Sequence, residues 1–205
     1  MDKALKSYSQ AAKQLGFAVS HKCISSTEVR LIKNQIQDSY SSWAHMIYDK
    51  AFLNWGLWDK KIYEEYKNLN FNFSTLCNVQ DIYSQLLLYY LIRPLIKKQF
   101  FNKRLLDIGS GNGIGLKASS KLLKTKYALG IDLVNKLVLN SHTNFYKNDE
   151  VNYIQADAEN LPVADAVFDI VTNLESSHLY PQIERFFAEV ERVLSDRKST
   201  RLNSS

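Results

Sequence analysis

The stretch Arg104-Leu-Leu-Asp-Ile-Gly-Ser-Gly-Asn-Gly-Ile-Gly115 decides the fold of this chain. An apolar run contains an acidic residue near its end, Asp107, and glycines follow at every second position from Gly109. Glycine permits positive φ and lets the backbone approach a ligand closely. Unpaired N–H groups at a helix N-terminus suit a polar or anionic ligand group. The stretch therefore predicts a buried strand, a tight turn that can hold a ligand, and the start of a helix.

Three further segments repeat the pattern of an apolar strand that ends in an acid. They are Tyr127–Asp132, Val151–Asp157 and Asp165–Glu175. Strands that alternate with helices predict a parallel sheet with helices on both faces. Ligands of such sheets bind beyond the carboxyl ends of the strands, which is where these acids lie.

The spacing of the glycines separates two kinds of nucleotide-binding turn. Dinucleotide folds use G-x-G-x-x-G, in which the third glycine lets helix and strand pack together. The residue three positions after Gly111 is Ile114, so an NAD-dependent oxidoreductase is disfavoured. The D-x-G-x-G-x-G pattern of Asp107, Gly109, Gly111 and Gly113 instead resembles motif I of class I S-adenosylmethionine (SAM) methyltransferases.

A closer resemblance covers the chain from Leu105 to Leu194. Its segments Gln155–Pro162, Asn173–Pro181 and Phe186–Leu194 resemble the branch that includes the phthiotriolone and phenolphthiotriolone dimycocerosate O-methyltransferases. The resemblance implies an α/β, Rossmann-like sheet, SAM as cofactor, and methyl transfer to a small or lipid-like acceptor, through a hydroxyl group. N- or C-methylation of a small metabolite is an alternative, and so is a SAM-binding protein without activity.

The expected SAM contacts begin with Asp132, which ends the second predicted strand 19 residues after Gly113. A carboxylate there can accept hydrogen bonds from both ribose hydroxyls, although a helix N-cap is the alternative. Asp157 and Ala158 follow the third strand, where a carboxylate and a backbone N–H fit the edge of adenine. Leu133 is expected against the adenine face, unless it is a core residue.

The glycine turn is expected to approach the rest of the cofactor. Gly109, Gly111 and Gly113 are therefore taken as cofactor-binding residues, as is Asp107. The Asp107 carboxylate is expected near the sulfonium or amino group of SAM. Its alternative role is that of a structural carboxylate bonded to amides of the loop.

Glu175 and His178 follow the fourth predicted strand, where acceptor and methyl donor meet. Methyl transfer is an in-line displacement at a sulfonium, and a hydroxyl acceptor must lose its proton. A histidine base typically contributes ~10²–10⁴-fold to such a step, so His178 is the candidate base, with Glu175 orienting it or holding the SAM amino group. In the alternative, Ser177 and His178 cap a helix that begins near Pro181. Tyr180 is a weaker candidate.

Residues 1–103 are predicted to form a helical cap over a SAM-binding domain of residues 104–195. Ser25-x-x-Glu28 is a capping box that opens a helix. Further helices are predicted over Lys3–Leu15 and from about Asp81 to Phe100, and Pro94 is expected to kink or break the second of these.

The segment Tyr48–Trp58 lies between the predicted helices. It resembles the aromatic-glycine segment that precedes motif I in sterol and cyclopropane methyltransferases, where it helps to cover SAM and the acceptor. A core-packing aromatic turn is the alternative, because aromatic clusters are usually buried.

The composition excludes several other classes. The 205 residues carry a net charge of +5 without a run of like charges, which gives a nucleic-acid partner little support. The apolar block Leu86–Ile92 is too short to span a bilayer. Cys23 and Cys77 are isolated, so no metal site is expected. These features predict a cytoplasmic protein whose cysteines are reduced.

The last ten residues, Asp196–Ser205, resemble the in-frame translation of a widely used sequencing-library adapter. A natural polar tail is the alternative. Residues resembling an adapter translation are not expected to contribute to the fold. We also expect a chain that contains only the first four strands of a family sheet whose spatial order is 3-2-1-4-5-7-6.

Overall fold

The structure, a computed structural model, describes residues 25–46, 52–69, 71, 81–145 and 151–195. The helix predicted over Lys3–Leu15 and the tail Asp196–Ser205 lie outside the described residues.

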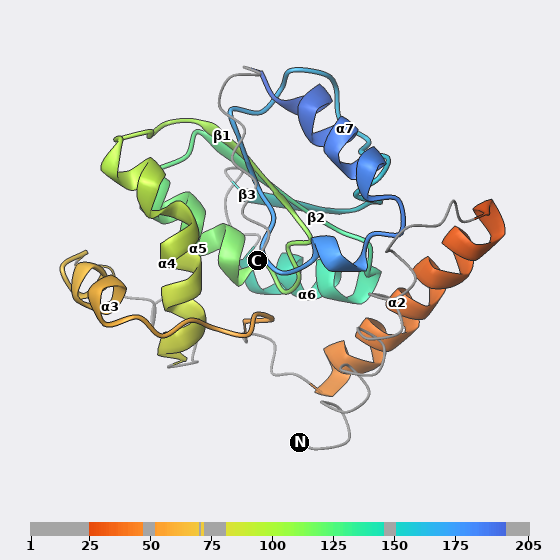
Figure 1. Cartoon of the computed structure of the whole chain (residues 1–205), viewed down its shortest axis with the longest axis horizontal. Helices are drawn as coiled ribbons and strands as arrows, with labels where there is room; N and C mark the ends of the chain where they lie inside the picture. The colour runs from red at the N-terminus through yellow and green to blue at the C-terminus, as the bar shows by residue number, and fades with distance from the viewer. Residues whose placement is uncertain (1–24, 47–51, 70, 72–80, 146–150, 196–205) are drawn as a thin grey trace.

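Four parallel strands form the centre of the molecule (Figure 1). They are β1 (Arg104–Ile108), β2 (Tyr127–Asp132), β3 (Val151–Gln155) and β4 (Ile170–Thr172). Their order in the sheet is β3-β2-β1-β4, so the predicted α/β topology is confirmed. In this register Asp107 pairs with Gly130, and Asp132 pairs with Gln155. The carboxyl ends of β1, β2 and β3 therefore share one edge of the sheet.

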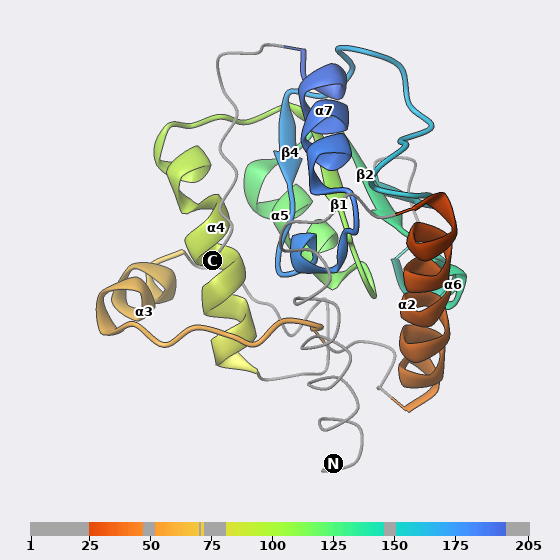
Figure 2. The same cartoon turned by 45° about the vertical axis from the view of Figure 1, so that its right-hand side comes forward.

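Helices cover both faces of the sheet (Figures 1 and 2). One face carries α5 (Ile114–Leu123) and α6 (Asn135–Phe145), and α4 (Ile82–Lys97) packs beside them. The other face carries α7 (Ile183–Val193). This arrangement follows from the sequence, because a strand that is apolar on both sides needs a partner on each face.

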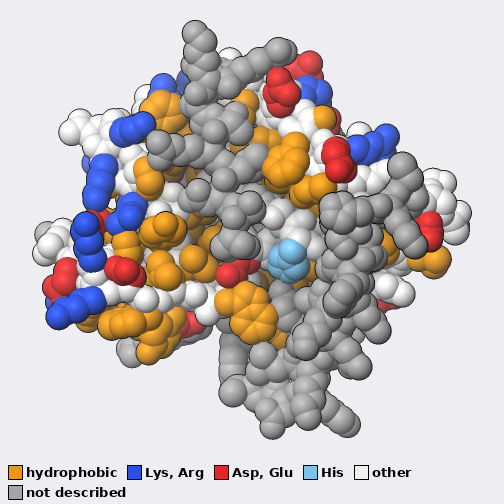
Figure 3. Space-filling view, in the orientation of Figure 1, with side chains coloured by type: hydrophobic (Ala, Val, Ile, Leu, Met, Phe, Trp, Pro, Cys, Tyr) orange, Lys and Arg blue, Asp and Glu red, His pale blue; other side chains and the backbone are white. Residues whose placement is uncertain are grey.

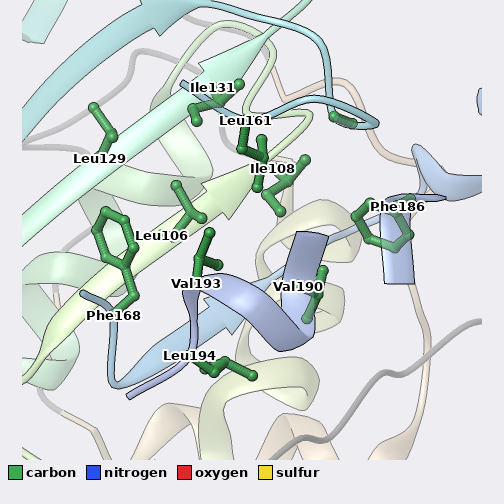
Figure 4. Packing of buried hydrophobic residues seen from close by; sticks show 11 residues of the cluster. Leu106, Ile108, Leu129, Ile131, Leu161, Phe168, Phe186, Val190, Val193 and Leu194 are labelled. Carbon is green, nitrogen blue, oxygen red and sulfur yellow. The ribbon is translucent and has the colours of Figure 1, made fainter. Parts of the chain in front are cut away.

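Alternate residues of the strands enter two separate cores. Leu105 and Ala128 pack with α5 and α6, whereas Leu106 and Leu129 face α7. Figure 4 shows the second core, in which Phe186 and its neighbours from α7 lie against the side chains of β1 and β2. Leu105 and Leu106 are 0% exposed, and each contributes roughly 1.5–3 kcal/mol by its burial.

The helix α2 (Ser26–Met46) begins at the predicted capping box. Glu28 N–H donates to Ser25 Oγ at 3.3 Å, and Ser25 N–H donates to a Glu28 carboxylate oxygen at 2.7 Å. These reciprocal bonds satisfy N–H groups that the first helical turn leaves without partners. In both views α2 lies beside α6 (Figures 1 and 2).

Of the kink or break predicted before Pro94, the break is wrong, because α4 runs through this residue to Lys97. Proline inside a helix removes one hydrogen bond and crowds the carbonyl group four residues earlier, and burial on both sides of Pro94 offsets this cost. The fully buried residues Leu86 and Ile92 anchor the helix before the proline, and Leu95 and Ile96 pack against the core after it. The helix α3 (Lys60–Lys67), which precedes α4, is capped by Asp59.

The chain just before β4 pairs with the end of α7 and the residues that follow it. Phe168 N–H donates to Val193 O at 2.9 Å, and Ser195 N–H donates to Phe168 O at 2.8 Å.

No helix among the described residues has both the length and the apolar character that crossing a bilayer requires.

Candidate functional site

A pocket opens at the shared carboxyl edge of the strands. Six of the eight predicted cofactor residues line it: Gly109, Gly111, Asp132, Leu133, Asp157 and Ala158. Glu175 lines it too, and so do Lys33 and Tyr40 of α2. Residues far apart in the sequence thus meet in one cavity, because parallel strands end at the same edge.

Asp132 is the most constrained carboxylate of this pocket. One oxygen accepts the Gly111 N–H at 2.8 Å, and the other accepts the Val134 N–H at 2.9 Å. The side chain therefore holds the glycine turn and the loop before α6. Burial raises the pKa of Asp132, and the backbone N–H groups oppose this rise. Each oxygen has a second lone pair, which can accept from a ligand hydroxyl.

Position 109 requires glycine because Ser176 lies directly against it. The φ of Gly109 is +75°, and a Cβ atom at this position would lie 2.2 Å from Ser176 Oγ. Gly109 N–H and Ser110 N–H both donate to Ile131 O, at 2.7 and 3.0 Å. These bonds fold the turn back over the end of β2, next to Asp132.

Asp107 lies beneath a neighbouring cavity, which it lines with Leu53, Asn54 and Gly111. Its Oδ1 accepts the Thr172 hydroxyl at 2.8 Å. Burial raises the pKa of Asp107 to about 7; the Thr172 hydrogen bond opposes the rise, and the charge of Asp132 adds to it. The bond to Thr172 comes from β4, not from loop amides.

Gly113 lies in neither cavity. It is the N-cap of α5, with φ +79°, and a Cβ atom there would lie 2.7 Å from the Tyr153 ring. Tyr153 OH donates to Gly113 O at 3.0 Å. This glycine therefore allows close packing of α5 on the sheet, and its contact with a cofactor stays a prediction.

Asp157 and Ala158 lie on the turn that follows β3. Asp157 Oδ1 accepts the Glu159 N–H at 3.0 Å, and its Oδ2 pairs with Lys33 Nζ of α2 at 2.5 Å. Leu133 packs in an apolar cluster with Ile36 of α2, so this wall of the pocket is partly made by the N-terminal half.

Lys33 is a pocket residue that the sequence did not indicate. The helical spacing of apolar residues in α2 indicates only that one face of this helix is buried. That spacing does not reveal which charged side chain reaches the sheet.

Glu175 adopts φ +54°, an unusual conformation for a residue with a side chain. Its carboxylate accepts the Trp55 N–H at 2.6 Å. Burial raises the pKa of Glu175, and this hydrogen bond opposes the rise. The contact ties the loop after β4 to the aromatic segment of the N-terminal half. Strained residues of this kind often occur at functional sites.

His178 lies in a short helical turn, η2 (Ser177–Leu179), three residues after Glu175, and its side chain is exposed. It does not line the pocket around Asp132. The partial burial of the ring lowers the pKa of His178, which favours the neutral imidazole. A neutral imidazole is the form that a general base requires.

The alternative role of His178 and Ser177 as helix caps is wrong. The helix α7 begins at Ile183, its N-cap is Gln182, and no side chain caps it. Instead, the Gln182 N–H donates to a Glu159 carboxylate oxygen at 2.5 Å.

A polar network beneath the glycine turn was also missing from the sequence prediction. Asn173 Nδ2 donates to Ile108 O, to Ser176 Oγ and to Tyr180 OH, at 2.9, 2.8 and 2.9 Å. Tyr180 lines the pocket, and burial raises the pKa of its hydroxyl. The network fixes the loop after β4 against the end of β1.

The aromatic segment before α3 divides into buried and exposed residues. Phe52 packs on the core, and Leu53 lines both cavities. Trp55 and Trp58 are 58% and 57% exposed, so an ordinary core-packing turn does not describe them.

Figure 3 shows Lys and Arg side chains gathered on the side of the molecule where α3 and α4 lie.

The family comparison agrees with this geometry. Residues 106–198 match the model of a methyltransferase domain. This part of the chain therefore resembles a methyltransferase domain, for which SAM is the implied cofactor. The residues present fit this cofactor, because Gly109, Gly111 and Asp132 line one pocket and Asp132 keeps acceptor capacity at its wall.

Curated relatives match the same part of the chain. It is 37% identical over 92 residues to the phthiotriol/phenolphthiotriol dimycocerosates methyltransferase of Mycobacterium tuberculosis. It is 38% identical over 92 residues to the fatty-acid O-methyltransferase of Mycolicibacterium smegmatis. Each match covers 45% of this chain, and 34% and 33% of the two relatives. The chain thus matches about a third of the length of these relatives.

One solved structure resembles a larger part of this chain than the two curated relatives do. The [4+2]-cyclase SpnF superposes with a TM-score of 0.59 and 17% identity, over 79% of this chain and 56% of SpnF. The likeness extends beyond the matched methyltransferase domain and concerns the fold alone. A fold of this kind therefore does not by itself specify the reaction.

Proposed function

We propose that this protein transfers the methyl group of SAM to an oxygen atom of a small or lipid-like acceptor. The observation that carries the proposal is the Asp132 carboxylate, bonded to the Gly111 N–H in a pocket that also contains Leu133 and Ala158. Two of the relatives it resembles are named for lipid substrates. When bound, SAM supplies a methyl group made electrophilic by the sulfonium.

We also propose the division of labour between the two halves. Residues 104–195 would bind SAM, and residues 1–103 would cap the site and form part of the acceptor pocket. Support comes from Lys33, Tyr40 and Leu53, which line the same cavity as Asp132. N- or C-methylation of a small metabolite, or SAM binding without turnover, are the competing outcomes.

Titration with SAM and with NAD tests the cofactor first. We expect calorimetric binding of SAM and none of NAD, because the turn lacks the glycine that dinucleotide folds place at Ile114. Fatty acids, long-chain alcohols and amines, offered with methyl-labelled SAM, then separate O- from N-methylation. Binding of NAD without SAM would overturn the proposal.

Asp132→Asn tests the ribose contact. The amide keeps the volume of the side chain but lacks one acceptor oxygen and the negative charge. We expect about a 100-fold weaker Kd for SAM, since a hydrogen bond to a charged group contributes ~1.5–3 kcal/mol. Calorimetry measures the change, and the matched control Asp38→Asn, at an exposed position of α2, leaves the Kd unaltered. An unaltered Kd in Asp132→Asn would contradict the assignment.

His178→Ala tests the proposed base and the type of acceptor together. A hydroxyl must lose its proton during transfer, whereas a carboxylate is already ionised. We expect kcat for an alcohol to fall about 100-fold, with the Kd for SAM unchanged. With a fatty acid as acceptor, kcat remains near that of the parent. Equal turnover of the alcohol by parent and variant would remove His178 as the base.

A further inference from the structure

One cationic side chain of α2 reaches across to the sheet. Lys33 Nζ lies 2.5 Å from Asp157 Oδ2 and 2.5 Å from Glu159 Oε2, and its side chain is 17% exposed. The partners are more than 120 residues away in the sequence. Lys33 lies outside the matched residues 106–198, so the family match does not account for it.

Lys33 compensates the negative charges of the two carboxylates. The Glu159 side chain is 2% exposed, and one of its oxygens accepts the Gln182 N–H at 2.5 Å. The other oxygen faces Lys33. A buried carboxylate is costly unless an opposite charge and hydrogen bonds accompany it. Lys33 supplies that charge from the N-terminal half of the chain.

The ion pairs stand at one end of the SAM pocket. Lys33, Asp157 and Ala158 line the cavity that also contains Asp132 and Leu133. On the proposed function, this end receives adenine. Asp157 Oδ2 has a lone pair beyond the one that faces Lys33, so it can also accept from the exocyclic amine.

A second contact holds α2 at the same place. Gln37 Nε2, one helical turn after Lys33, donates to Leu133 O at 3.1 Å. Figure 2 shows α2 lying along α6, whose preceding loop carries Leu133. Helix α2 is therefore fixed to the residues expected at both the edge and the face of adenine.

We propose that Lys33 is a positioning residue of the cofactor site. Its ion pairs with Asp157 and Glu159 hold α2 as the wall over the adenine end, and they hold the Asp157 carboxylate in place as an acceptor. The inference rests on the proposed function, and it assigns part of SAM recognition to the N-terminal half.

The test compares Lys33→Met, which keeps the apolar stem, with Lys33→Arg, which keeps the charge. Two probes are titrated by calorimetry, S-adenosylhomocysteine and 5′-methylthioadenosine, which lacks the amino-acid part. We expect Lys33→Met to bind both about tenfold more weakly, and Lys33→Arg to stay within about threefold of the parent. Arg30→Met, at an exposed position of the same helix, is the matched control and changes neither Kd. In turnover, Lys33→Met raises KM for SAM and leaves kcat unchanged, because the adenine end is remote from the transferred methyl group.

Several results would overturn the inference. They are an unchanged Kd in Lys33→Met, an equal loss in Arg30→Met, or a loss for S-adenosylhomocysteine that methylthioadenosine does not share. If Lys33→Met fails to fold, the double variant Lys33→Met/Glu159→Gln removes the unbalanced buried charge, and the tenfold loss must persist in it. A parent protein that binds neither probe refutes the proposed function as well. Binding by the parent with an unaffected Lys33→Met refutes this inference alone.

Discussion

Gly109→Ala is expected to destabilise the protein by about 3 kcal/mol or more and to abolish SAM binding. Two costs combine at this position. The φ of +75° is strained for alanine, which costs roughly 1–2 kcal/mol. The new Cβ would also lie 2.2 Å from Ser176 Oγ and 2.6 Å from Ser176 Cβ. Ser176 cannot move freely, because it bonds to Asn173 and Tyr180. Urea unfolding measures the loss of stability, and calorimetry measures the loss of binding.

Gly115→Ala is the matched control for this prediction. Gly115 lies in α5, and a Cβ atom there meets only Leu88 Cδ1, at an ordinary contact distance of 3.8 Å. We expect no loss of stability and a gain of up to about 1 kcal/mol, because alanine favours helix. The double variant Gly109→Ala/Ser176→Gly separates the clash from the strain, since it relieves only the clash. A Gly109→Ala protein with the unfolding midpoint of the parent would show that the turn does not have this geometry.

Asp107→Asn is expected to change the pH dependence of stability. The folded-state pKa of Asp107 is about 7, raised by burial from an ordinary value of 3.8. Between about pH 4 and 7 the unfolded chain has released this proton while the folded protein keeps it. The free energy of unfolding therefore falls as the pH rises through this window, by up to about 4 kcal/mol from this group. Above pH 7 both states are ionised and the loss is complete.

The asparagine variant removes this titration. Its amide oxygen can still accept the Thr172 hydroxyl, so the packing is retained. At pH 8 we expect Asp107→Asn to be more stable than the parent by about 4 kcal/mol, and at pH 5 by only about 2 kcal/mol, because most of the titration window lies above pH 5. Urea unfolding at both pH values checks this, with Asp38→Asn as the exposed control. A stability difference that is the same at pH 5 and pH 8 would mean that Asp107 is not a buried group of raised pKa.

The prediction of the fold depended on short-range patterns that hold in any context. The apolar run before Asp107, the glycines after it and the three later strand segments predicted a parallel sheet, and the family resemblance implied the strand order that the structure has. The capping box at Ser25 and Glu28 is equally local, since its atoms are three residues apart. Pro94 was misread because its local effect is opposed by the packing of α4, which the sequence around it does not reveal.

The strand-end residues of the candidate site were also predictable. Asp132, Leu133, Asp157 and Ala158 line one cavity because parallel strands bring their carboxyl ends together. By contrast, Gly113 follows the glycine pattern but is needed for the packing of α5 on Tyr153. Spacing alone does not distinguish a glycine that faces a ligand from one that faces a ring.

What the sequence determined by itself is the set of parallel strands and the acids at their ends, because these follow from periodicity and from residues close along the chain. Only the tertiary structure decided that Lys33 pairs with Asp157 and Glu159, that Glu175 binds the Trp55 N–H, and that Ser176 faces Gly109. Each of these contacts joins segments more than 60 residues apart. Such contacts depend on how two elements pack, and the local preferences of either segment do not encode that packing.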